Sequence, residues 1–81
     1  MQMSESVFML LKSDPSASSV ELARFLQRFP GVDGVWMTEG AYSFIAKFSA
    51  PEGTVPLLAR RIAKHKAVLE LECIRAPISM E

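Results

Sequence analysis

Few side chains in this sequence are of a type that carries out catalysis, and they do not gather in a recognisable arrangement. His65 is the only histidine and lies between two lysines, which favours a structural or solvent-exposed role. Cys73 is the only cysteine, so no internal disulfide can form, and it lies on the apolar side of a predicted strand, where a thiol is usually inert. Glu70 and Glu72 share an exposed strand face rather than a pocket. With no Cys/His cluster and no glycine-rich loop, we predict no enzymatic activity, no catalytic residue, no metal and no cofactor.

Polar residues and a glycine meet at one place, the turn between two apolar runs at residues 35–38 and 42–48. β-Branched and aromatic residues are prominent in both runs, which is typical of paired strands. Gly40 follows Glu39 at the junction and can adopt the positive φ that a short hairpin turn needs. We expect a hairpin in the middle of the fold, and its turn is the first place to look for function.

A strand and a helix are predicted before the hairpin. Residues 6–12 are apolar at nearly every position, which favours a strand covered on both faces. Ser18, with Glu21 three residues later, predicts a capping box that opens a helix. The helix ends at Pro30-Gly31, because proline cannot continue it and glycine turns the chain. One apolar stripe with helical spacing marks its buried side: Leu22, Phe25, Leu26 and Phe29.

A second helix and a last strand are predicted after the hairpin. Thr54 is the expected cap, with Pro56 in the first turn. The helix has a buried side and a basic solvent side, formed by Val55, Leu58 and Ile62 and by Arg60, Arg61 and Lys64. The strand at 68–75 alternates and predicts a sheet edge, with Leu69, Leu71 and Cys73 inward and Glu70, Glu72 and Arg75 outward. This order of elements predicts an α+β, ferredoxin-like βαββαβ fold: a four-stranded antiparallel sheet with two helices on one face.

Length and charge limit the remaining possibilities. The 81 residues suffice for one small domain, so we expect residues 1–81 to form a single domain. Nine basic residues balance nine acidic ones, and the zero net charge argues against general binding to nucleic acid or to anionic lipid. No apolar run reaches membrane-spanning length, and the N-terminus has no secretion signal. We therefore expect a soluble, cytoplasmic protein.

The predicted architecture leaves apolar side chains without cover. Two short helices cover only one face of a sheet, whereas apolar residues occur on both sides of the predicted strands. An exposed apolar patch of this kind usually marks an interface, and a domain this short gains much stability from added burial. We therefore predict self-association through the uncovered sheet face or through an edge strand, with an interface that includes Phe8, Leu10, Trp36 and Ile45.

The hairpin and its flanks resemble the stand-alone ligand-binding module, or RAM domain, of the Lrp/AsnC family of transcriptional regulators. Residues 29–32, Phe-Pro-Gly-Val, resemble the family's PxV step, and residues 40–42, Gly-Ala-Tyr, match its hairpin. Residues 44–50 resemble the following strand, and residues 67–69 stand where the family usually has a glycine-valine entry to the last strand. The resemblance covers residues 6–78, nearly the whole chain.

This resemblance implies homodimers that assemble further into rings through their sheets and hairpins, with a small amino-acid effector in clefts between subunits. The implied ligand-binding residues are Glu39, Gly40, Ala41, Tyr42 and Ser43. Gly40 would let a ligand approach the backbone, whose N–H groups would hold a carboxylate, while Glu39 would pair with an ammonium group and the Ser43 hydroxyl would add a polar contact. Ser43 and Glu39 replace the aspartate and threonine usual in the family. The chain has no room for a DNA-binding domain, so any role in transcription would act through a partner, a DNA-binding Lrp/AsnC regulator.

Two alternatives remain open from the sequence. The main one is a protein-interaction module that binds no small molecule, in which the turn residues only shape a hairpin. The other is an RNA-recognition motif, which has the same element order and carries aromatic residues on its first and third strands, as do Phe8, Tyr42, Phe44 and Phe48. The RNA motif fits poorly, because Gly40-Ala41 stand where it has a basic residue and a glycine, and its last aromatic falls on Lys47.

Overall fold

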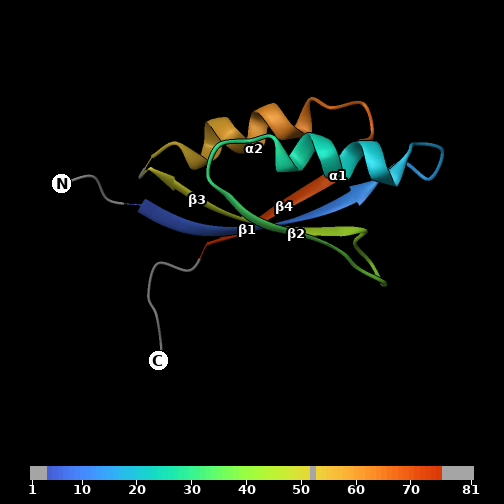
Figure 1. The fold of residues 1–81 in the computed structure, drawn as a ribbon, viewed down its shortest axis with the longest axis horizontal. Coiled ribbons are helices and arrows are strands. Elements are labelled where there is room, and N and C mark those ends of the chain that lie inside the picture. Colours follow the sequence, from blue (N-terminus) through green and yellow to red (C-terminus); the bar gives the residue numbers. More distant parts are fainter. Residues whose placement is uncertain (1–3, 52, 76–81) are drawn as a thin grey trace.

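The computed structural model describes residues 4–51 and 53–75, with elements in the order strand, helix, strand, strand, helix, strand. They are β1 (Ser4–Ser13), α1 (Ser19–Gln27), β2 (Val32–Met37), β3 (Phe44–Pro51), α2 (Val55–Ala63) and β4 (Val68–Arg75). The strands pair antiparallel in the order β2-β3-β1-β4, and both helices lie on one face of the sheet (Figure 1). The predicted ferredoxin-like α+β fold is confirmed.

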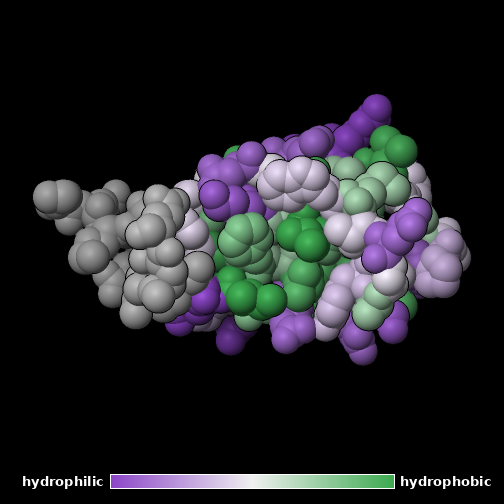
Figure 2. All heavy atoms as spheres, turned by 90° about the horizontal axis from the view of Figure 1, so that it is seen from below, coloured by the Kyte–Doolittle hydropathy of each residue, from purple (hydrophilic) through white to green (hydrophobic). Residues whose placement is uncertain are grey.

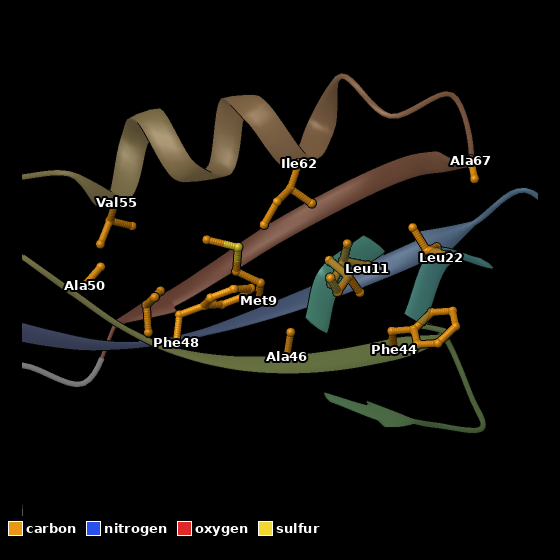
Figure 3. Close-up of a cluster of buried hydrophobic side chains, with 12 residues drawn as sticks. Met9, Leu11, Leu22, Phe44, Ala46, Phe48, Ala50, Val55, Ile62 and Ala67 are labelled. Atoms are coloured by element: carbon orange, nitrogen blue, oxygen red, sulfur yellow. The ribbon is translucent and has the colours of Figure 1, made fainter. Parts of the chain in front are cut away.

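The hydrophobic core lies between the helices and the covered face of the sheet (Figure 3). Successive side chains of a strand point to opposite faces, so alternate residues of β1 and β3 enter this core. Each large side chain buried here contributes about 1.5–3 kcal/mol gross. The buried residues are Val7, Met9, Leu11, Leu22, Leu26, Phe44, Ala46, Phe48, Ala50, Val55, Ile62 and Ala67.

β1 is central in the sheet but covered on one face only. Its composition predicted cover on both faces, yet Phe8 and Leu10 are only half-buried. Neighbouring strands on both sides shield these two side chains in part, and no helix lies over them. The prediction of a doubly covered strand is therefore wrong for the isolated subunit.

α1 begins as predicted and ends earlier than predicted. The Ser18 Oγ accepts a hydrogen bond of 3.3 Å from the Glu21 N–H, which satisfies one of the free donors of the first turn. The last helical residue is Gln27, because the residue before a proline disfavours helical backbone and the chain leaves the helix ahead of Pro30. Phe29 thus lies outside α1, but its ring still packs edge-on against Phe25, 5.1 Å between centroids.

α2 has the predicted amphipathic character without the predicted cap. Thr54 stands at the N-cap position, but its hydroxyl donates to the Pro51 carbonyl at 2.6 Å and does not cap the helix. Val55 and Ile62 are buried and Leu58 is half-buried. The predicted basic side is exposed as expected, at Arg60, Arg61 and Lys64. Among the described residues, neither helix combines the length and apolar character needed to cross a membrane.

β4 lies at one edge of the sheet, as its alternation predicted. Leu71 and Cys73 are half-buried on the core side. Leu69 was predicted to join them but is exposed, because the pairing of β1 with β4 shifts register between Lys12 and Ser13. One extra residue in a strand reverses the side on which the next side chains point.

Candidate functional site

A loop of residues 38–43 joins β2 to β3 and carries the predicted ligand-binding residues. The sequence predicted a short turn with the strand resuming at residue 42, but β3 begins at Phe44. Thr38 closes the loop twice: its N–H donates to the Ser43 carbonyl at 2.9 Å, and its hydroxyl donates to the Tyr42 carbonyl at 2.8 Å. Residues 38–43 all lie between the two strands, so the loop is longer than a two-residue hairpin turn. The hydrogen bond from the Thr38 hydroxyl is a local side-chain contact that holds the loop closed.

Ser43 ties the loop to the end of β1. Its N–H donates to the Leu11 carbonyl at 2.8 Å, and its hydroxyl accepts a hydrogen bond of 3.2 Å from the Ser13 N–H. The hydroxyl was predicted to contact a ligand, whereas its oxygen here accepts a hydrogen bond from the Ser13 backbone N–H. Ser43 therefore positions the loop, and its hydroxyl hydrogen and second lone pair are left for contact with a ligand.

Tyr42 connects the loop to the opposite edge of the sheet. Its hydroxyl donates to the Glu72 carboxylate of β4 at 2.6 Å. This hydrogen bond, helped by desolvation and by the negative charges of Glu72 and Glu70, raises the pKa of the tyrosine hydroxyl above its usual value of 10.0. The sequence placed Tyr42 in register with Phe44 and Phe48, but it lies before β3 and outside the buried core.

Glu39, Gly40 and Ala41 are exposed at the tip of the loop. Gly40 has φ +123°, and a Cβ built on it would have no atom within 4 Å. No backbone N–H of these three residues donates a hydrogen bond to another residue that the structure describes. Successive free N–H groups of this kind suit a carboxylate, and the Glu39 carboxylate suits an ammonium group. The tip therefore has the chemistry to recognise an amino acid but lacks walls of its own.

The four predicted interface residues gather on the face of the sheet that the helices leave open. Trp36 pairs with Ile45, and Ile45 with Leu10, so these residues form one row across β2, β3 and β1. Phe8 lies in the adjacent row beside Lys47, whose Nζ is 6.0 Å from the centroid of the ring. Figure 2 shows hydrophobic side chains across the middle of this face, with hydrophilic ones around them. We call these four residues and Ile74 the open-face patch.

Ile74 belongs to this patch although the sequence analysis omitted it. It pairs with Phe8 across the β1–β4 ladder and is exposed, whereas Arg75 pairs with the buried Val7. The assignment of Arg75 to the outward series with Glu70 and Glu72 was therefore wrong. Counting every second residue from Glu70 leads to Ile74, so the signal was present in the sequence.

Trp36 is the most prominent side chain of the patch, with 52% of its surface exposed. Its indole ring folds back over Gly34: a Cβ built on that glycine would lie 2.6 Å from the ring. A glycine two residues earlier on the same strand thus leaves room for the ring to lie against the sheet. In this position the ring offers a broad apolar surface to a partner.

The residues considered for catalysis, His65 and Cys73, make local contacts or are partly buried in the fold. The His65 Nδ1 accepts a hydrogen bond of 3.0 Å from the Ala67 N–H, and its ring lies 4.4 Å from that of Phe25. Partial burial raises the pKa of the Cys73 thiol, which keeps it protonated and poorly nucleophilic. Within residues 4–51 and 53–75, no three His, Cys, Asp or Glu side chains gather as a metal site would require.

Comparison with known proteins found similarity in structure only. No family model matches the chain, and no curated protein sequence matches it. Escherichia coli AsnC superimposes with a TM-score of 0.81 at 14% identity, over 95% of this chain and 53% of AsnC. The leucine response regulatory protein LrpA of Mycobacterium tuberculosis gives 0.81 at 16% identity, over 95% and 53%. TTHA0845 of Thermus thermophilus gives 0.76 at 18% identity, over 95% and 98%.

The chain therefore has the fold of a domain found in AsnC and Lrp regulators and spans about half the length of those regulators. It spans nearly all of TTHA0845. The resemblance to the Lrp/AsnC family that the hairpin motifs indicated is confirmed for the fold.

Proposed function

We propose that this chain is a self-assembling regulatory module that binds a small amino-acid effector beside the loop of residues 38–43. The observation that carries the proposal is the open-face patch, an apolar surface that reaches all four strands with no helix over it. Scattered apolar residues are normal on a protein surface, but adjacent rows on one sheet face are typical of an interface. The fold shared with AsnC and Lrp regulators supports a regulatory role rather than an enzymatic one.

Assembly through the open face would also complete the effector site. The tip of the loop offers three free backbone N–H groups and a carboxylate but is exposed on all sides, and a small ligand binds well only where most of its surface is buried. Tyr42 and its partner Glu72 reach from the loop to the outward side of β4, at the margin of the open-face patch. A neighbouring copy seated on the patch would therefore lie close to the loop and could supply the missing walls.

The role in transcription would be indirect. AsnC and LrpA are about twice the length of the part that this chain matches. Because the matched domain has the same fold, this chain could assemble with a DNA-binding regulator of that type and alter its response to the effector. The partner regulator would be recognised through the same open face.

The competing functions make different use of the same surfaces. A protein-interaction module without a ligand would keep the open-face patch. Its loop would only connect β2 to β3, with its shape fixed by the hydrogen bonds of Thr38 and Ser43. An RNA-recognition motif needs aromatic rings exposed on its two central strands. Of the rings considered, Phe44 and Phe48 are buried in the core and Tyr42 lies outside β3. Phe8 is therefore the one ring of the four on the open face of a central strand, which disfavours base stacking.

A thermal-shift panel of the common amino acids tests the effector part of the proposal. A ligand at a hundredfold excess over its Kd stabilises the folded state by about 2.7 kcal/mol, which raises the Tm of a domain this small by about 10–20 °C. Glu39→Gln should weaken binding of the active amino acid about tenfold, because it removes the carboxylate that pairs with the ammonium group. Glu21→Gln, a change of the same kind on the exposed face of α1, should leave binding unchanged. No shift with any amino acid would favour the interaction module.

A further inference from the structure

An apolar groove lies at the opposite end of β3 from the loop of residues 38–43. It has a volume of about 310 Å³ and is open on one side. Its walls come from the α1–β2 connection, the end of β3 and the first two turns of α2. Among the lining residues are Phe29, Pro30, Ala50, Leu57, Leu58 and Arg61. The groove shares no residue with the loop or with the open-face patch.

The backbone of the α1–β2 connection gives the groove its shape. Gly31 crosses β3 so closely that a Cβ on it would lie 2.2 Å from the Ser49 carbonyl oxygen, and the Ser49 N–H donates to the Gly31 carbonyl at 2.8 Å. This contact fixes the segment that holds Phe29 and Pro30 as one wall. Ala50 is buried at the end of β3 and points toward Val55 of α2 (Figure 3). A side chain as short as that of Ala50 leaves the space between the walls unfilled.

The lining contains one charged side chain, and the other polar ones are already bonded. The Ser49 hydroxyl donates to the Asp33 carboxylate at 2.7 Å, and the Thr54 hydroxyl donates to the Pro51 carbonyl at 2.6 Å. Asp33 itself does not line the groove. The Arg61 guanidinium makes no hydrogen bond or ion pair with any other residue that the structure describes. An apolar trough with an unpaired cation at its wall is complementary to an apolar molecule that bears an anionic group.

We propose that this groove binds a small carboxylic acid with an apolar body, whose carboxylate pairs with Arg61 while the body lies between Phe29, Leu57 and Leu58. The volume is near the lower end of the range of about 300–1,000 Å³ for ligand sites, which suits a single ring or short chain. The guanidinium fork presents paired N–H donors to both carboxylate oxygens. This site is separate from the proposed effector site and does not depend on it.

Three probes of equal size test the charge preference on the full chain: 3-phenylpropanoate, 3-phenylpropanol and 3-phenylpropylammonium. Isothermal titration calorimetry should rank them acid, then alcohol, then ammonium. Arg61→Gln should weaken binding of the acid about five- to tenfold and leave the alcohol within about twofold, since only the charged contact is lost. Arg60→Gln is the matched control, because Arg60 is the exposed neighbour on α2 that does not line the groove. Leu57→Ala should weaken all three probes alike.

Chemical-shift mapping with ¹⁵N-labelled protein locates the bound acid. Shifts centred on Gly31, Ala50 and Leu58 are expected, and Arg61→Gln should reduce them. Shifts centred on residues 39–43 would mean that the acid occupies the loop, and shifts centred on Phe8 and Ile45 would mean that it coats the open face; either result overturns the proposal. The proposal is also overturned if the acid shows no saturable binding, if the alcohol binds as well as the acid, or if Arg60→Gln and Arg61→Gln have equal effects.

Discussion

Gly31 has a backbone conformation and a close backbone neighbour that both disfavour a side chain at this position. Its φ of +84° is in the left-handed region that side chains disfavour, and it also lies against the Ser49 carbonyl. Gly53 has nearly the same φ, +86°, but open space where its Cβ would be. Comparing the same substitution at the two glycines therefore distinguishes the cost of a left-handed backbone from the cost of a clash with neighbouring backbone.

We expect Gly53→Ala to destabilise the protein by about 1–2 kcal/mol, the cost of the left-handed conformation alone. Gly31→Ala should cost clearly more, because β3 and the α1–β2 connection must move apart and the Ser49–Gly31 hydrogen bond must lengthen. Urea unfolding followed by circular dichroism measures both. Equal losses for the two variants would mean that the close approach at Gly31 is unimportant.

Tyr42 is the only tyrosine, so its titration can be followed alone by absorbance. The hydrogen bond to Glu72 favours the neutral hydroxyl and raises its pKa above 10.0. The stability that this bond contributes is therefore complete below about pH 10, the unfolded pKa, and is lost as the pH rises through the higher folded pKa.

Glu72→Ala should return the Tyr42 pKa toward its usual value, because it removes the largest cause of the shift. Glu70→Ala should have a smaller effect, since Glu70 acts only through its charge. A spectrophotometric titration of the tyrosinate band distinguishes the two variants. If they moved the pKa equally, the bond between loop and sheet edge would not exist in solution.

The helix α1 shows which features of an element can be predicted from sequence. Its apolar stripe and its Ser18 cap depend on residues within a few positions of one another, so local patterns were sufficient. For α2 the same kind of pattern was misleading, because the Thr54 hydroxyl bonds back to Pro51 instead of capping the helix. A threonine hydroxyl before a helix can accept a hydrogen bond from an N–H of the first turn or donate one to a carbonyl a few residues earlier, and the sequence does not say which of the two it makes.

We expect Ser18→Ala to lower the free energy of unfolding by about 1 kcal/mol, the usual value of a side-chain cap. Ser19→Ala, one position later in the first turn, should be neutral or slightly stabilising, because alanine has the higher helix propensity. Denaturant unfolding of the two variants side by side gives the difference. A smaller loss for Ser18→Ala than for Ser19→Ala would show that Ser18 does not cap α1.

Strands depend more on partners that are distant in sequence, and most of the errors of prediction lie there. Tyr42 was placed in β3 by its alternation with Phe44, but its hydroxyl bonds to Glu72, 30 positions away. Leu69 was placed in the core, but a register shift against β1 turns it outward. Likewise the sequence identified apolar residues on both sides of the sheet without deciding which side the helices cover.

At the scale of the whole molecule, the division of apolar residues between two sheet faces is the main feature. One set, with Val7, Met9 and Leu11 on β1, fills a complete core under the helices. The other set, the open-face patch, has no layer of helices packed over it in the isolated subunit. The sequence predicted four of its five members because a chain this short has more apolar residues than one layer of helices can cover.

The molar mass in solution, measured by light scattering at micromolar concentration, tests the proposed assembly most directly. We predict a mass of two or more times the 9.0 kDa subunit mass. Trp36→Lys should reduce the mass to that of one subunit, because a charge replaces the largest side chain of the patch. Val20→Lys, at a residue of α1 that is 59% exposed, should leave the assembly intact. A wild-type mass of 9.0 kDa at every concentration, or equal dissociation by both variants, would contradict assembly through the open face.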